Sequence, residues 1–470
     1  MAQRPEMGAV VGEFDGVSLG DARLDERMLK IASLIAASPS DSFPDAMETE
    51  ADQEALYRFF ANPKVTAEKL LSGHRRATGE RIAGRTRIRV VHDTSEFKFE
   101  GDREGLGILQ GQTKGFFGHF ALAVGGDEAR EPLGVLGIRP FINIDVPARR
   151  GLTQAQKNNA ATRKPREEKK SRRWEEHAIE VAKTLPEGVE AIHVMDQEAD
   201  DMSVFSALER EGLKFVIRAD PKRLTVDGTP LEELLAKQEA KTFRAVRISA
   251  RSRKQATKAH PERKERTATL VVRVGVANFV RAKTRFEPAC HVTLYAVHVL
   301  EPNPPAGEAP VDWMLLTNQP ILTPQQLEQL VDDYRARWMI EEYFKALKTG
   351  CAFEKRQLCS FDGLLRALAL LVPMAWQLLR LRHVARDEVV RPAAAVLSAN
   401  QLYLLGILLE KRGRSLPRSP TARDVMLGVA ALGGHIKNNG DPGWIVLGRG
   451  FHRLADAEDL WNALQRSDQS

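Results

Sequence analysis

The chain has 470 residues, of which 43% are hydrophobic and 28% are charged. Such a length corresponds to about two to four domains, and the composition is typical of a globular protein with a hydrophobic core, which excludes a collagen, a coiled coil or a disordered chain. The formal net charge of +6 is compatible with a polyanionic partner but is too small to identify one. The three cysteines form no CxxC pair, so we expect no disulfide framework and a reducing compartment.

Residues 1–75 predict a helical N-terminal domain. Apolar side chains recur at helical spacing in residues 25–37 and 51–60, and the Asn-Pro pair at 62–63 ends the pattern. No segment here alternates between polar and apolar residues, so no strand is expected. Nor is there a charged start followed by an apolar run, so we expect no signal peptide and a cytoplasmic protein.

Residues 76–385 predict an α/β domain. Strands are expected at 88–93, 116–124, 133–144, 189–196 and Lys214–Arg218, and helices at 174–184 and 203–210. In residues 163–173, seven of eleven are Lys or Arg. Between about 224 and 315 the sequence predicts a mostly β insertion, with strands at 243–250, 267–280, 291–301 and Asp312–Thr317 and a basic turn at 251–266.

The rest of the chain predicts helices. A long helix is expected over 324–349, because Thr323 is suited to cap it, Pro324 to begin it and Gly350 to end it. Further helices are expected at 361–385, 397–411 and 422–433, followed by a Gly/Asn-rich turn and a short tail. The most apolar stretch, 364–379, contains Arg366 and Pro373 and is shorter than the roughly 20 residues of a spanning helix, so we interpret it as a core helix and expect no membrane partner.

Three carboxylates are placed for chemistry. Asp93 and Asp196 end strands, and Glu341 lies within the long helix. Carboxylates at the carboxyl ends of strands project into the crevice where α/β folds bind ligands, and Mg²⁺ prefers such oxygen ligands. Two such ions, about 3.5–4 Å apart, would clamp a phosphodiester. Taken singly, an Asp at a strand end is more often a turn former or a helix cap.

One face of the long helix carries an acid among cations. At about 100° per residue, Tyr334, Arg337, Glu341 and Lys348 fall within a narrow arc and Lys345 lies beside it, whereas Glu342 lies off it. A carboxylate for a metal beside cations for phosphates suits a DNA backbone. The alternative is an ordinary stripe of i,i+3 and i,i+4 ion pairs.

The spacing Y-(2)-R-(3)-E-(6)-K from Tyr334 to Lys348 resembles the signature of the IS-four class of bacterial insertion-sequence transposases, the class of the transposon Tn-five transposase. The sequences His-Asp-Thr-Ser at 92–95 and Asp-Gln-Glu-Ala-Asp at 196–200 resemble the two Asp motifs of that family, although Gln197 stands where the family often has Arg. Residues 19–23 and 57–63 resemble its N-terminal DNA-binding domain.

The resemblance implies an α/β fold: an RNase H-like catalytic core (76–385) interrupted by the β insertion, an end-binding domain (1–75) and a helical dimerisation domain (386–470). Asp93, Asp196 and Glu341 would be the DDE triad, binding two Mg²⁺ ions, with Mn²⁺ as the alternative. Trp313 would stabilise a flipped base. The remaining DNA-binding positions are basic or phenolic: Tyr334, Arg337, Lys345, Lys348, Arg218, Arg27 and Arg58.

The function implied is cut-and-paste transposition. The enzyme would bind terminal inverted repeats, cleave transposon ends through a hairpin and join the 3′-OH to target DNA, acting as a homodimer in a synaptic complex at the bacterial nucleoid. Two alternatives stay open: a catalytically inactive DNA-binding regulator, and an RNase H-like nuclease without strand transfer.

Overall fold

The computed structural model describes residues 10–37, 42–109, 113–142, 169–248, 262–387, 389–436 and 441–467. Most of the two basic stretches, at 163–168 and 251–261, lies outside the described residues, as do the ends of two expected strands at 143–144 and 249–250.

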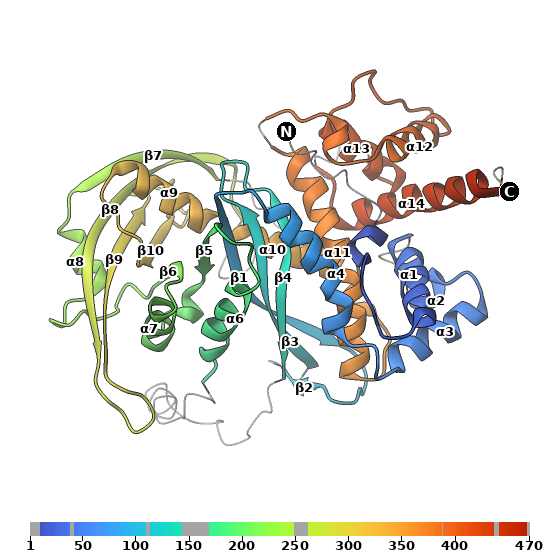
Figure 1. The fold of residues 1–470 in the computed structure, drawn as a ribbon. Helices are drawn as coiled ribbons and strands as arrows, with labels where there is room; N and C mark the ends of the chain where they lie inside the picture. The colour runs from blue at the N-terminus through green and yellow to red at the C-terminus, as the bar shows by residue number, and fades with distance from the viewer. Residues whose placement is uncertain are drawn as a thin grey trace.

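One ten-stranded sheet runs through the centre of the molecule (Figure 1). Its strands are β1 (Arg87–Phe99), β2 (Gly107–Ile108), β3 (Lys114–Gly125), β4 (Pro132–Phe141), β5 (Glu190–Met195), β6 (Lys214–Arg218), β7 (Ala240–Ile248), β8 (Arg266–Arg281), β9 (Cys290–Leu300) and β10 (Asp312–Thr317). Their order is β2-β3-β1-β5-β6-β10-β9-β8-β7, and β4 also pairs with β3. The expected β insertion therefore extends this sheet, because β10 pairs antiparallel with β6.

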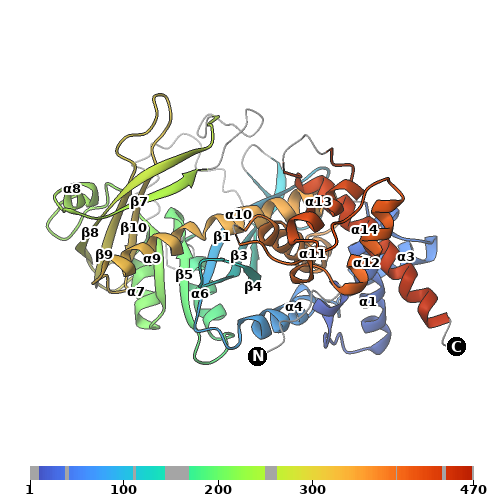
Figure 2. The same ribbon diagram turned by 90° about the horizontal axis from the view of Figure 1, so that it is seen from above.

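Helices cover the sheet and form both ends of the chain. They are α1 (Ala22–Ala37), α2 (Phe43–Ala46), α3 (Glu50–Ala61), α4 (Ala67–Ile82), α6 (Arg172–Ala182), α7 (Met202–Arg210), α8 (Leu231–Ala236), α9 (Pro324–Arg335), α10 (Trp338–Lys345), α11 (Phe361–Ala385), α12 (Ala399–Glu410), α13 (Ala422–Leu432) and α14 (Trp444–Ser467). Helices α6 and α7 pack on one face of the sheet, and α9 and α10 pack on the other (Figure 2). The mixed α/β fold with helical termini is as expected.

The N-terminal and C-terminal helices lie together at one end of the molecule (Figures 1 and 2). Helix α11 connects them to the sheet: Arg366 Nε donates to the Val65 carbonyl at 2.6 Å, and Trp376 Nε1 donates to the Pro132 carbonyl at 2.9 Å. Among the described residues α11 is the one helix long and apolar enough to cross a membrane, and 83% of its apolar window is buried inside the protein. Its interpretation as a core helix is confirmed.

Two expectations for the C-terminal half are wrong. The long helix is broken between α9 and α10, where the amide of Arg337 bonds the carbonyl three residues back, on Tyr334, at 3.0 Å. No Pro or Gly marks this tightened turn in the sequence, so pattern alone did not predict it. The expected short tail is in fact the 24-residue helix α14, which packs on α13 and α1.

A buried ion pair joins the N-terminal segment to the sheet. Glu13, in the 3₁₀ helix η1 (Val10–Phe14), accepts hydrogen bonds from Arg81 Nη1 at 2.7 Å and from His74 Nδ1 at 2.5 Å. The other nitrogen of His74 accepts from the Val135 amide at 2.9 Å, so His74 is neutral and Arg81 supplies the positive charge. Burial raises the pKa of Glu13, but its partners His74 and Arg81 outweigh that effect and lower the pKa from 4.5 to about 2.

We expect Glu13 to make acid stability pH-dependent. Its folded-state pKa is depressed, so its contribution of about 3 kcal/mol is complete above the ordinary value of 4.5 and is lost as the pH falls from there toward 2. Urea unfolding should therefore show that wild type and Glu13→Gln differ in their free energy of unfolding by a constant amount above pH 5. Below about pH 4.5 this difference should shrink as the pH falls. A difference that does not change with pH would contradict this assignment.

Candidate active site

Two of the three carboxylates lie side by side on neighbouring strands. Strands β1 and β5 are parallel, with Val91 opposite Val194. Two residues further along each strand come Asp93 and Asp196, on the same face of the sheet because side chains alternate between faces. Asp196 Oδ1 also caps the short 3₁₀ turn Gln197–Ala199 by accepting from the Glu198 amide at 2.8 Å. The cap interpretation thus accounts for one of its two oxygens.

Arg337 connects the third carboxylate to the first. Its Nη1 lies 3.1 Å from Asp93 Oδ2, and its Nη2 lies 2.5 Å from Glu341 Oε1. The guanidinium therefore bridges β1 and α10. The Arg337–Glu341 pair is an i,i+4 ion pair of the kind that the sequence left open as the alternative to a DNA contact, but the second pair, with Asp93, was not expected.

The electrostatics of this cluster favour a bound cation. Burial raises the pKa of Asp93 to about 7; Arg337 opposes this shift, and the charges of Asp196 and Glu341 add to it. Burial also raises the pKa of Asp196. Arg337 pairs with two of the three carboxylates, and Asp196 lies near the charges of Arg337 and Arg173, so an additional positive charge would relieve the repulsion among the three acids. Their oxygens are the ligand type of Mg²⁺ and Mn²⁺, so the donor set fits a divalent metal.

A row of residues continues from the acids across the sheet. Met195 is opposite Ile217 and Arg218 is opposite Leu315, so Arg218 follows Asp93 and Asp196 in line. Two residues along β10, Trp313 lies on the same face as Arg218. Its ring is half-buried and meets the edge of the buried Tyr334 ring, with the centroids 5.4 Å apart.

Tyr334 also belongs to this neighbourhood. Its pKa is raised by burial, while the charges of Arg337 and Arg218 act to lower it. Asp93 and Asp196 are therefore joined on their face of the sheet by five more of the residues expected from the sequence: Glu341, Arg337, Tyr334, Arg218 and Trp313.

The other expected cations lie differently. Lys348 Nζ donates to the Glu96 carbonyl and lies 5.3 Å from the Phe97 ring, beside β1. Lys345 pairs with Glu342 at 2.6 Å, and its Nζ lies 5.4 Å from the centroid of the Trp338 ring. Two more positions are exposed on the N-terminal helices: Arg27 on α1 and Arg58 on α3, where Arg58 pairs with Glu54. Their DNA contacts stay predictions.

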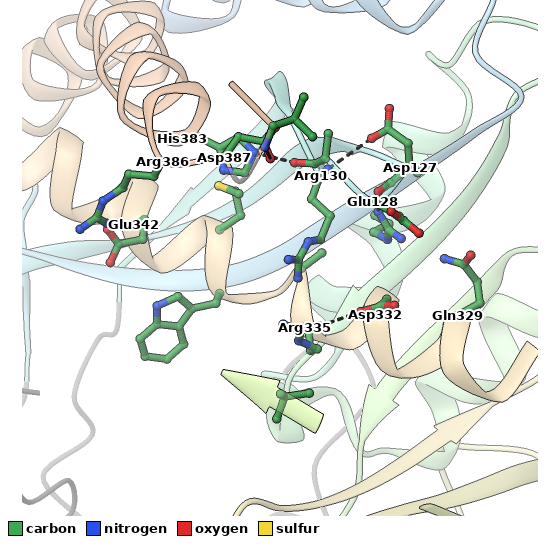
Figure 3. Close-up of a pocket in the computed structure, with 18 of the residues that line it drawn as sticks. Asp127, Glu128, Arg130, Gln329, Asp332, Arg335, Glu342, His383, Arg386 and Asp387 are labelled. Atoms are coloured by element: carbon green, nitrogen blue, oxygen red, sulfur yellow. Dashed lines mark hydrogen bonds and ion pairs between the residues drawn. The ribbon is translucent and has the colours of Figure 1, made fainter. Parts of the chain in front are cut away.

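A cavity of about 1090 Å³ is lined by residues other than Asp93, Asp196 and Glu341. Figure 3 shows Glu342, Asp332 and Arg335 among its lining residues, the last two paired at 2.9 Å. Glu341 and Glu342, adjacent on α10, thus face two different environments.

Comparison with known proteins adds two family matches. The model described as Transposase DNA-binding matches residues 6–65, and the model described as Transposase DDE domain matches residues 162–377, which include Asp196 and Glu341. Among solved structures, the chain is similar to a piggyBac transposase in a synaptic complex with hairpin DNA. The alignment covers 81% of this chain and 73% of the piggyBac chain, at 10% sequence identity and a TM-score of 0.36. That similarity is too low to carry an inference.

Proposed function

The chain belongs to the DDE transposases, metal-dependent enzymes that cleave DNA, and we propose that it carries out cut-and-paste transposition of an insertion sequence of the IS-four class. The observation that carries the proposal is the bridge from Asp93 through Arg337 to Glu341, with Asp196 on the neighbouring strand. The Y-R-E-K spacing from Tyr334 to Lys348 supports the class.

Strand order supports an RNase H-like core as the catalytic domain. Such a core has three antiparallel strands followed by two parallel ones, which is the arrangement of β4, β3, β1, β5 and β6. The proposed triad comes from β1, from the end of β5 and from the helical segment after the insertion. In this proposal the catalytic domain spans residues 76–385.

The chemistry divides between ions and side chains. Two Mg²⁺ ions, or Mn²⁺ ions, held by Asp93, Asp196 and Glu341 would activate a water and stabilise the departing 3′ oxygen. Arg337 carries two donors in a plane that fits a phosphate, and Lys348 and Arg218 add charge for the DNA backbone. After the first nick, the freed 3′-OH would attack the opposite strand and form a hairpin. A second water would open it, and the 3′-OH would then attack target DNA.

DNA cleavage and joining test the proposal directly. A labelled duplex with the element's own terminal repeat is incubated with Mg²⁺ and a supercoiled target plasmid. We expect nicking, hairpin formation and strand transfer into the plasmid. Cleavage without transfer would indicate a nuclease, and binding without cleavage would indicate an inactive regulator.

Partner and location complete the proposal. Residues 1–75, with Arg27 and Arg58, would bind transposon ends, as the match at residues 6–65 supports. Residues 386–470 would dimerise in the synaptic complex, at the nucleoid in the cytoplasm. Light scattering of the protein bound to end DNA should give two chains and two duplexes.

Trp313 is expected to act at the hairpin step. Stacking of a flipped base on an aromatic ring is worth about 1–3 kcal/mol, so Trp313→Ala should slow hairpin formation roughly tenfold or more. First-strand nicking should change little, because Trp313 lies two strands from the nearest carboxylate. The matched control is Trp338→Ala, which removes an exposed Trp from the separate cavity. Equal loss of nicking and hairpin formation would refute this role.

A further inference from the structure

Four buried histidines lie on the face of the sheet opposite Asp93. They are His92 on β1, His119 on β3, His193 on β5 and His177 on α6, and none is more than 2% exposed. His92 precedes Asp93, so strand alternation directs the two side chains to opposite faces. This histidine group takes no part in the function proposed above, and the inference from it is independent of that function.

Three of these rings are placed to share a ligand. His92, His119 and His177 can each offer a nitrogen such that the three atoms lie within 4.8 Å of one another. Among the described residues, one nitrogen of each ring is buried without a hydrogen-bond partner: Nδ1 of His92, Nε2 of His119 and Nδ1 of His177. Buried polar atoms almost always have partners, so three unpartnered nitrogens on neighbouring rings, whose centroids lie 5.2 to 5.8 Å apart, indicate a missing group.

The outer nitrogens of two rings are already bound. His92 Nε2 lies 2.9 Å from His193 Nδ1, and His119 Nδ1 lies 2.9 Å from Thr94 Oγ1. When these outer nitrogens donate, the unpartnered nitrogen of each ring keeps its lone pair. Metal-binding histidines are usually oriented in this way by a partner on the far nitrogen.

The surroundings keep the rings in the form that binds metals. Burial holds the pKa of His119 well below its usual range and lowers the pKa of His177 to about 3, so both rings are neutral. Nearby positive charges are compensated: Arg139 pairs with Glu176 at 2.5 Å, and Arg173 pairs with Glu198 at 2.5 Å.

We propose that His92, His119 and His177 bind one Zn²⁺ ion, with the fourth position left to water. Imidazole nitrogen suits zinc, whereas Mg²⁺ prefers oxygen, so this site would be chemically distinct from the carboxylates. With Zn–N distances of about 2.0–2.1 Å, tetrahedral ligands lie about 3.4 Å apart, so metal binding would draw the three nitrogens, now within 4.8 Å of one another, closer together by up to about 1.4 Å. The ion would tie β1, the strand that carries Asp93, to β3 and α6.

Zinc content of the full-length protein tests the proposal. The protein is dialysed against a chelator, reloaded with Zn²⁺, desalted and analysed by mass spectrometry, and Co²⁺ is used in parallel to record the absorption bands of a nitrogen-rich site. We expect one zinc per chain in wild type and a fall to less than about one tenth of that in His119→Gln and in His177→Gln.

Two variants serve as controls. His383→Gln changes a partly buried histidine of α11, bonded to the Ala129 carbonyl at 2.6 Å, and should keep the zinc. Glu341→Gln should also keep it, because the carboxylate lies on the other face of the sheet. Loss of zinc in Glu341→Gln with retention in the histidine variants would place the ion at the carboxylates and overturn the proposal.

Wild type alone also decides the question if the histidine variants do not fold. Removal of zinc from the loaded, folded wild-type protein with a chelator should lower its Tm, and addition of zinc should restore it. A folded wild type that takes up neither zinc nor cobalt would overturn the proposal. None of these outcomes depends on DNA cleavage, so they leave the transposase assignment unaffected.

Discussion

Glu341→Gln should reduce cleavage of transposon-end DNA by roughly a thousandfold or more, about 4 kcal/mol of transition-state free energy, while binding of the same DNA is kept. Glutamine has nearly the same shape but removes the charge that would hold a metal beside Asp93. Arg337, now bonded to Glu341 at 2.5 Å, keeps its partner Asp93 at 3.1 Å and should stay in place. Single-turnover cleavage in Mg²⁺ and gel shifts in a chelator measure the two effects separately.

The matched control is Glu342→Gln, one residue further along α10. Glu342 lines the separate cavity and pairs with Lys345 at 2.6 Å and Arg382 at 3.3 Å. We expect cleavage within about threefold of wild type, since only partly exposed ion pairs are lost. If both variants lost cleavage equally, or if Glu341→Gln kept it, Glu341 would not be the third member of the triad.

A second large effect is expected at Asp333 on α9, this time on stability. Its fully buried carboxylate accepts from Arg89 Nε at 2.8 Å and from Arg87 Nη2 at 2.7 Å, and Arg89 is itself 1% exposed. Asp333→Asn removes the negative charge and leaves the buried Arg89 without its carboxylate, whereas Arg87 keeps Glu190 at 3.7 Å. We expect a loss of about 3–5 kcal/mol in the free energy of unfolding, measured by urea denaturation.

The neighbouring residue provides the control for Asp333. Asp332 pairs with Arg244 at 2.8 Å and Arg335 at 2.9 Å, but its side chain is 26% exposed. Asp332→Asn should therefore cost about 1 kcal/mol or less. If both variants lost a similar free energy of unfolding, burial would not explain how much the Asp333–Arg89 ion pair contributes to stability.

Asp93 and Asp196 could be predicted as part of one site, because each belongs to an apolar strand pattern and the two strands run in the same direction. Asp196 directly follows β5, as expected, but the expectation that Asp93 ends its strand is wrong, because β1 continues to Phe99 through its pairing with β3. The two carboxylates still meet, because β1 and β5 are parallel neighbours and place them at the same level. The helix-face argument grouped Tyr334, Arg337 and Glu341 correctly even though the helix is broken at the second of them. Lys345, which the same argument placed beside them, pairs with Glu342, and its contact with DNA stays a prediction.

Other features depend on packing that no local pattern records. Helix α14 contains Gly448 and Gly450, each of which lowers helix propensity by about 1 kcal/mol. A Cβ at Gly448 would lie 2.6 Å from the Gly350 carbonyl oxygen, and one at Gly450 would lie 1.7 Å from that of Val429. The glycines therefore permit close helix packing, although in the sequence they indicate a turn. The histidine group was missed for a similar reason: its successive members are 16 to 58 residues apart in the sequence, and only the packing of three strands and α6 brings them together.

The sheet is continuous from β1 through β5 and β6 to β10, so it fixes the distance between the strand that carries Asp93 and the strand that carries Trp313. Three strand spacings of about 4.8 Å separate the backbone of Asp93 from that of β10, roughly 14 Å in all. This backbone separation is fixed, because hydrogen bonds hold each strand to its neighbour. A DNA end that touches both Trp313 and the acids would therefore have to span a distance that the hydrogen-bonded sheet sets, and not a flexible loop.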